Sequence, residues 1–127
     1  MYRICTCPIV TIHLENGVYL FDGNSATGKT RLMELLNRIS DSTYCVLGYT
    51  YSDTRKIALC ELLNKNHYEV VLVDRADMYL TQEDLEFLIK YAKEAIVMID
   101  YKGNSLDVEY LEDCYILMTE EKIEVVS

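Results

Sequence analysis

Residues 23–30 constrain the fold of this chain more than any other segment. Their sequence, GNSATGKT, matches the pattern G-x-x-x-x-G-K-[ST] at every fixed position. In this pattern the glycines allow backbone N–H groups to curl around a phosphate, the lysine reaches the outer phosphates, and the threonine hydroxyl can bind Mg²⁺. The helix that follows has an N-terminal dipole that favours an anion. The segment therefore predicts a strand, a phosphate-binding loop and a helix in succession.

Composition narrows the class of protein that can carry this loop. A chain of 127 residues, half of them hydrophobic, predicts a single domain over residues 1–127 with a sizeable core. The net charge of -9 disfavours nucleic acid and anionic membranes as partners. No apolar run is long enough to span a bilayer, and no segment has the pattern of a signal peptide. Together with five scattered cysteines that lack metal-site spacing, these features predict a cytoplasmic protein with reduced thiols.

The segment before the loop has the pattern of two short strands. Residues 9–14 alternate, with Val10, Ile12 and Leu14 on one face, and residues 18–21 form a second apolar run. Asn16-Gly17 lies between them, and this dipeptide is a strong signal for a tight turn. We therefore expect an antiparallel hairpin that leads into the phosphate-binding loop.

After the loop, helical and strand patterns alternate along the chain. This order predicts an α/β fold with a mainly parallel sheet, helices on both faces and antiparallel hairpins at the two ends. The final hairpin is expected to turn at Glu120–Glu121. Three helices are expected: one begins near Gly28 with Leu32, Leu35, Leu36 and Ile39 inward, one begins at Ser52 or Asp53 with Leu59, Leu62 and Leu63 inward and ends near 64–66, and one begins at Thr81, where Asp84 completes a capping box. The expected strands cover residues 43–51, 70–73, 95–99, 115–118 and 123–126. Residues 106–111 are expected to form a short helix or a loop.

Asp74 supplies a second element of a nucleotide site. It follows the continuous apolar run Val70–Val73, which is typical of a strand buried on both faces. Open α/β sheets bind ligands at the carboxyl ends of their strands. We therefore predict that Asp74 holds Mg²⁺ together with Thr30, either directly or through water.

With these two motifs the chain resembles the P-loop NTPase superfamily, and within it the ABC-type and related additional-strand ATPases. The resemblance implies a three-layer sandwich that binds ATP and Mg²⁺. It also implies that an extra strand, 95–100, lies between the strand of the loop and the strand of Asp74. The implied order across the sheet is 114–119, 17–22, 95–100, 69–74, 43–50.

The sequence departs from that family in its catalytic motifs. Arg75 stands where ABC-type ATPases usually have the glutamate that polarises water, and no L-S-G-G-Q-like signature is present. Asp100 stands near the position of a polar sensor that is often histidine. Asp77 and Asp100 are the candidates to replace the missing acid, although solvated loop carboxylates are the alternative. The resemblance thus implies slow or partner-dependent hydrolysis.

The motifs of this chain are also compatible with functions other than ATP hydrolysis. A non-enzymatic nucleotide sensor, or an interaction module with a degenerate site, is compatible with the same motifs. A small-molecule kinase has less support, because no arginine follows Arg75 to form a lid over the phosphates. The partners expected are a nucleoside triphosphate and a second protein or another copy of the chain. The candidate site residues are Gly23, Asn24, Ser25, Ala26, Thr27, Gly28, Lys29, Thr30 and Arg31 for the nucleotide, Thr30 and Asp74 for the metal, and Lys29, Asp77 and Asp100 for catalysis.

Overall fold

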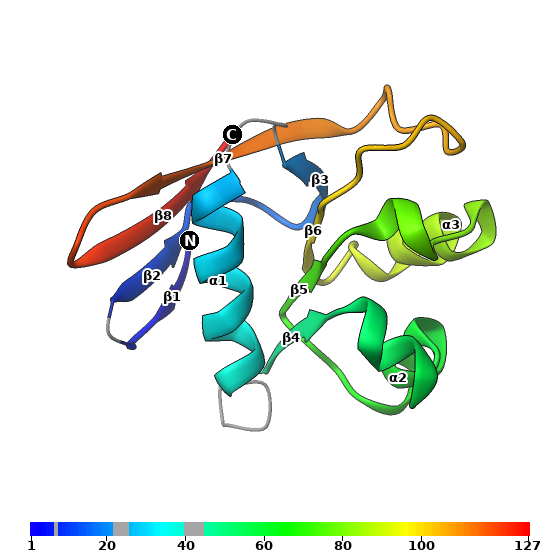
Figure 1. Ribbon diagram of the computed structural model, residues 1–127, viewed down its shortest axis with the longest axis horizontal. Coiled ribbons are helices and arrows are strands. Elements are labelled where there is room, and N and C mark those ends of the chain that lie inside the picture. Colours follow the sequence, from blue (N-terminus) through cyan, green and yellow to red (C-terminus); the bar gives the residue numbers. More distant parts are fainter. Residues whose placement is uncertain (7, 22–25, 40–44) are drawn as a thin grey trace.

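The computed structural model describes residues 1–6, 8–21, 26–39 and 45–127, and they form an α/β fold. Strands and helices alternate through the middle of the chain, while strands alone make up both ends (Figure 1). The strands are β1 (Tyr2–Ile4), β2 (Ile9–Ile12), β3 (Gly17–Phe21), β4 (Val46–Tyr49), β5 (Val70–Val73), β6 (Ile96–Ile99), β7 (Glu112–Met118) and β8 (Lys122–Val126); the helices are α1 (Ala26–Ile39), α2 (Leu59–Lys65) and α3 (Gln82–Tyr91), with 3-10 turns η1 (Tyr51–Arg55) and η2 (Ala76–Met78).

The described strands make one mixed sheet in the order β1-β2-β8-β7-β3-β6-β5-β4. Neighbours from β7 to β4 are parallel, whereas β1 with β2 and β7 with β8 are antiparallel. The order β7-β3-β6-β5-β4 agrees with the one that the resemblance implied, including β6 between β3 and β5. All carboxyl ends of β3, β4, β5 and β6 therefore lie at one edge of the sheet.

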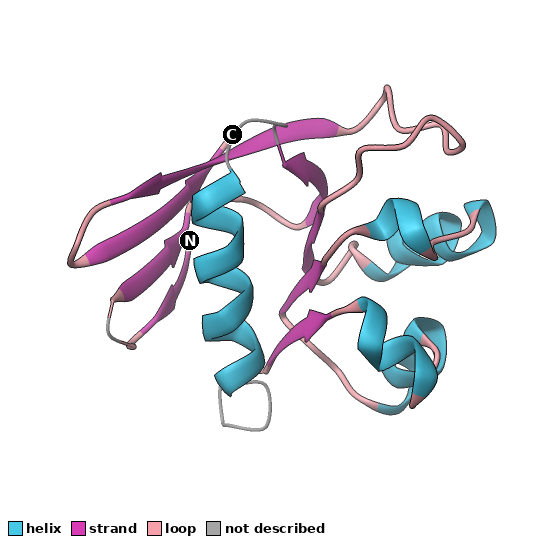
Figure 2. Cartoon of the chain, in the orientation of Figure 1, coloured by secondary structure: helices cyan, strands magenta, loops and turns pink. Residues whose placement is uncertain are grey.

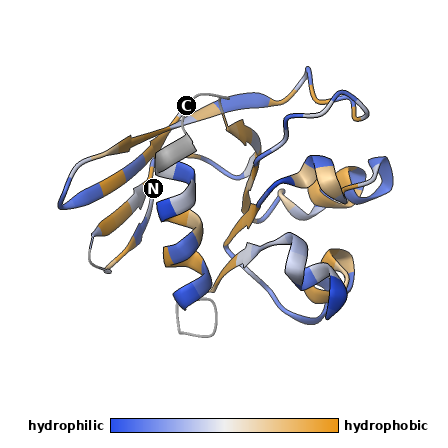
Figure 3. Cartoon of the chain, in the orientation of Figure 1, coloured by the Kyte–Doolittle hydropathy of each residue, from blue (hydrophilic) through white to orange (hydrophobic). Residues whose placement is uncertain are grey.

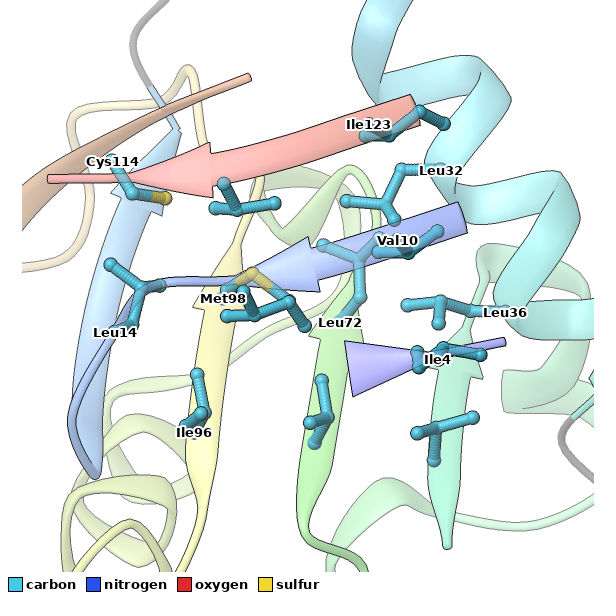
Figure 4. Close-up of a cluster of buried hydrophobic side chains, with 14 of the residues drawn as sticks. Ile4, Val10, Leu14, Leu32, Leu36, Leu72, Ile96, Met98, Cys114 and Ile123 are labelled. Carbon is cyan, nitrogen blue, oxygen red and sulfur yellow. The ribbon is translucent and has the colours of Figure 1, made fainter. Parts of the chain in front are cut away.

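Helix α1 packs against one face of this sheet. The β1, β2 and β8 part curls around α1, so that the helix lies between the two halves of the sheet (Figures 1 and 2). Leu32 and Leu36, on its inward side, are fully buried and meet residues from both halves, including Val10 and Leu72 (Figure 4). The i, i+3, i+4 spacing of its leucines thus has the predicted role.

Helices α2 and α3 cover the opposite face of the parallel strands. Their buried leucines, among them Leu63, Leu85 and Leu88, form a second cluster with Val71 and Val97. The central strands are buried on both faces, and they stand out as hydrophobic beside the polar outer sides of the helices (Figure 3). Continuous apolar runs, rather than alternating ones, are the expected sequence of such strands.

The expected hairpin around Asn16-Gly17 is wrong. Strand β2 pairs with β1 and β8, and β3 pairs with β6 and β7, so the two runs separate instead of pairing. Position 17 still favours glycine, because its φ of +150° is rarely adopted by other residues. The chain bends at Asn16 without forming the expected hairpin turn, so the dipeptide did not identify the partner of either strand. The N-terminal antiparallel hairpin exists, and its strands are β1 and β2.

Two other boundaries differ from expectation. Asp53 does act in a capping box with Thr50, but the box caps the start of the 3-10 turn η1, and α2 begins only at Leu59. Residues 106–111, which were expected to form either a short helix or a loop, contain no helix and form a loop. The capping box of Thr81 and Asp84 and the terminal β7–β8 hairpin are confirmed.

Candidate functional site

Strand register brings Asp74 and Asp100 together. Val73 of β5 lies opposite Ile99 of β6, and each aspartate is the next residue of its strand. The main chain continues the ladder there, since the N–H of Asp100 donates to the carbonyl of Val73 (2.9 Å). The two carboxyl groups are therefore neighbours at the carboxyl edge of the sheet, where α/β proteins bind ligands.

Lys29 reaches this edge from the first turns of α1. Its Nζ lies 2.8 Å from Oδ1 of Asp100, and the side chains of Lys29 and Asp100 are only 8% and 13% exposed. Such a short, shielded contact is a charge-assisted hydrogen bond rather than a loose surface pair. The lysine of the GKT sequence and the aspartate after β6, which the sequence offered as separate catalytic candidates, thus form one ion pair.

These groups line a polar pocket of about 400 Å³. Lys29 and Thr30 come from α1, Asp74 from the end of β5 and Asp100 from the end of β6. Asp77, on η2, is also at the wall of the pocket. The full lining is Lys29, Thr30, Asp74, Arg75, Asp77, Asp100 and Lys102. Every described residue that the sequence assigned to catalysis or metal binding therefore lies in one pocket.

Burial and neighbouring charges together raise the pKa of the Asp74 carboxyl group. Burial raises the pKa of its carboxyl above the ordinary value, and the neighbouring charge of Asp100 raises it further. The positive charges of Arg75 and Lys29 oppose that rise. The folded protein thus disfavours a negative charge on Asp74, and a cation placed beside it relieves the cost.

Gly28 has a structural role as well as its place in the motif. A Cβ at this position would lie 2.7 Å from Cγ2 and 3.1 Å from Cβ of Ile116, on β7. A Cβ contact of 2.7 Å is shorter than those found in proteins, so a side chain at position 28 would force Ile116 or the first turn of α1 to shift. The close packing fixes where Lys29 and Thr30 enter the pocket.

Three features in or beside the pocket were not foreseen in the sequence. Lys102 adds a second lysine, and its position three residues after the end of β6 was the available signal. Arg75 adopts a left-handed backbone with φ of 49°, an uncommon conformation for a side chain of this size. The hydroxyl of Tyr79 donates to the carbonyl of Asp74 (2.6 Å) and so holds the turn after β5.

Other candidates lie elsewhere or outside the described residues. Gly23, Asn24 and Ser25 belong to the part of the chain that is not described, and Ala26 and Thr27 begin α1. Arg31 is next to Glu34 on the helix surface, at 4.0 Å, and does not line the pocket. Of the motif residues that the structure describes, the pocket lining contains Lys29 and Thr30.

Two residues of the pocket, Thr30 and Asp74, carry oxygen atoms of the kind that can bind Mg²⁺. Among the residues that the structure describes, no group of three or more His, Cys, Asp and Glu is arranged to hold a metal. Mg²⁺, however, is commonly held by one or two carboxylates and a hydroxyl, with phosphate and water oxygens as the remaining ligands. Asp74 and Thr30 fit that role, and both belong to the pocket.

Comparisons with known proteins give no relative for this chain. No protein-family model matches it, and neither the curated proteins nor the solved structures contain a match. Within the described residues, no helix combines the length and the apolar character needed to cross a membrane. The function of the chain is therefore inferred from the residues of the pocket.

Replacing Asp74 with asparagine is expected to raise the stability of the ligand-free protein at pH 7. Because the folded-state pKa of Asp74 is raised, its charge costs stability above that pKa and costs nothing below the ordinary value near 3.8. The gain from Asp74→Asn should therefore shrink as the pH falls towards 4. Urea unfolding of both proteins across this range measures it.

Asp77→Asn is the matched control, since Asp77 is an exposed carboxylate of the same pocket. It should leave stability nearly unchanged. A wild type more stable than Asp74→Asn at pH 7 would show that the Asp74 carboxylate is favourably placed without a ligand.

Proposed function

We propose that this chain is an ATP-binding P-loop domain, similar to additional-strand ATPases, in which hydrolysis is slow or depends on a partner. The observation that carries the proposal is the convergence of Lys29 and Thr30, from the GKT sequence, with Asp74 in one pocket. The position of β6 between β3 and β5 supports it. In a P-loop, Lys29 would bind the outer phosphates, and Thr30 with Asp74 would hold the Mg²⁺ that neutralises them.

Slow hydrolysis is inferred from the positions and partners of the acidic residues in the pocket. Arg75 follows Asp74 where a water-polarising acid is expected, and Asp100 is already engaged by Lys29. Asp77 remains as an exposed carboxylate at the pocket that can orient water. A partner protein, or another copy of this chain, can supply a missing catalytic group in trans, as happens in other phosphoryl-transfer systems.

A second candidate is an interaction module with a degenerate site. Gly28 is required by the packing of α1 on β7, and Lys29 is satisfied by Asp100. Both residues therefore have structural uses that do not need a nucleotide. Under this hypothesis the motif stabilises the fold and the protein acts through its surface. A sensor that binds nucleotide without turnover lies between the two candidates.

Thermal unfolding with and without nucleotide separates these candidates. Binding stabilises a folded protein by RT ln(1 + [L]/Kd), which is about 2.7 kcal/mol when the ligand is at a hundred times its Kd. We expect millimolar Mg-ATP and Mg-ADP to raise the melting temperature of the wild type and to leave that of Lys29→Ala unchanged. No rise in the wild type would favour the interaction module.

A phosphate-release assay on the same samples then tests turnover. Slow release that a partner accelerates is the expected result. Stabilisation without any release, even with the partner present, would favour the sensor. Turnover by the isolated chain at about 10 s⁻¹, the median for enzymes, would contradict the slow version of the proposal.

A further inference from the structure

The Lys29–Asp100 ion pair has a consequence for ligand binding at this site, if the proposed function holds. The Lys29 ammonium lies 2.8 Å from the Asp100 carboxylate, and both side chains are largely shielded from water. A phosphate bound by the loop would need the same ammonium group. The carboxylate and the phosphate are both anions that accept charge-assisted hydrogen bonds, so they are direct competitors for Lys29.

Asp100 is the fixed member of the pair. Its N–H donates to the carbonyl of Val73 (2.9 Å), and its own carbonyl accepts from the N–H of Ala76 (2.7 Å). The main chain on both sides of the carboxylate is thus held by β5 and by the turn that follows it. Lys29, by contrast, has a flexible four-carbon stem. Exchange of partners therefore means that Lys29 leaves Asp100.

When Lys29 leaves Asp100, the repulsion between the carboxylates of Asp74 and Asp100 is no longer offset. Asp74 is the cross-strand neighbour of Asp100, and the negative charge of Asp100 already raises the pKa of Asp74. Without the lysine, the two adjacent carboxylates lose the positive charge that pairs with Asp100 and opposes the rise in the pKa of Asp74. Two neighbouring carboxylates repel each other when both are charged, and burial strengthens the repulsion. The free site therefore favours the pair over an open state.

We propose that Asp100 is an autoinhibitory residue, which holds Lys29 in the free protein and competes with the nucleotide phosphate for it. The ion pair lowers the affinity for any nucleotide phosphate that must recruit Lys29. This places Asp100 as a regulatory residue rather than a catalytic base.

Calorimetric titration with Mg-ADP tests the proposal without interference from hydrolysis. Asp100→Asn removes the competing charge and keeps a side chain of the same shape, and Asp100→Ser provides a second variant in case the first does not fold. Each should bind Mg-ADP about tenfold more tightly than the wild type, which corresponds to the loss of one charge-assisted hydrogen bond. Lys29→Ala added to either variant should remove the gain.

Asp77→Asn is the control for general electrostatics, because it deletes the same charge from the exposed side of the same pocket. Solvent screening should limit its effect to about twofold. A wild type that binds, with Asp100 variants that bind no more tightly than Asp77→Asn, would overturn the autoinhibitory role and leave the nucleotide site intact. Failure of the wild type and of every variant to bind would overturn the nucleotide site itself.

Discussion

Lys29→Met is expected to lower the free energy of unfolding of the ligand-free protein by about 3 kcal/mol, the lower end of the range for breaking a buried ion pair. Methionine keeps the apolar stem but removes the ammonium that lies 2.8 Å from Asp100. Asp100 is then left as a shielded carboxylate beside Asp74 without its cation. Chemical denaturation at pH 7, with the wild type in parallel, measures the loss.

Two comparisons make this result specific to the buried pair. Lys65→Met breaks an exposed pair with Glu61 on α2, in which the side chains are 63% and 58% exposed, and it should cost only about 0.5 kcal/mol. The double variant Lys29→Met with Asp100→Asn should recover most of the loss, because neither charge then lacks a partner. Equal losses for Lys29→Met and Lys65→Met would contradict the account.

Leu72→Ala is expected to cost about 3 kcal/mol, within the range for emptying a core leucine site. Leu72 is 2% exposed on β5 and lies in the cluster that faces α1, close to Met98 and Val10 (Figure 4). Its loss leaves a cavity between the sheet and the helix that carries Lys29. The same denaturation experiment measures the change.

The control for Leu72→Ala is Leu117→Ala on β7. Leu117 is 55% exposed, so its replacement removes the same atoms from a strand without creating a cavity. Its cost should stay within about 0.5 kcal/mol. Similar losses at both positions would mean that the cluster around α1 is not the stabilising core.

Much of the parallel half of the sheet could be predicted from the sequence. Each of its strands and helices has a strong local pattern, such as the Val70–Val73 run and the capping box at Thr81. The edge that gathers the site residues follows from the fact that parallel strands end on the same side. Asp74 and Lys29 were therefore correctly expected near one another.

The curled half could not be predicted in the same way. Strand β1 has three residues, and only Ile4 among them is buried, so it offers no alternation to detect. The parallel pairing of β2 with β8 joins segments from opposite ends of the chain, and no local signal encodes it. Asn16-Gly17 was misleading for the same reason, since a turn signal says nothing about long-range partners.

The contact between Lys29 and Asp100 also required the structure. Both residues were candidates, but their pairing depends on the register of β3 with β6 and on the close approach of α1 to β7 at Gly28. These are properties of tertiary packing. The sequence thus supplied the members of the site, and the fold supplied the interaction that we propose regulates it.

The most direct test of the central claim compares nucleotides that differ only in their phosphates. Mg-ATP, Mg-ADP and adenosine should be titrated into the wild-type chain in a calorimeter. We expect saturable binding of one Mg-ATP or Mg-ADP per chain, a loss of that binding in Lys29→Ala and no binding of adenosine. Equal binding of adenosine, or no binding of any of the three at millimolar concentration, would contradict a phosphate-binding site at Lys29.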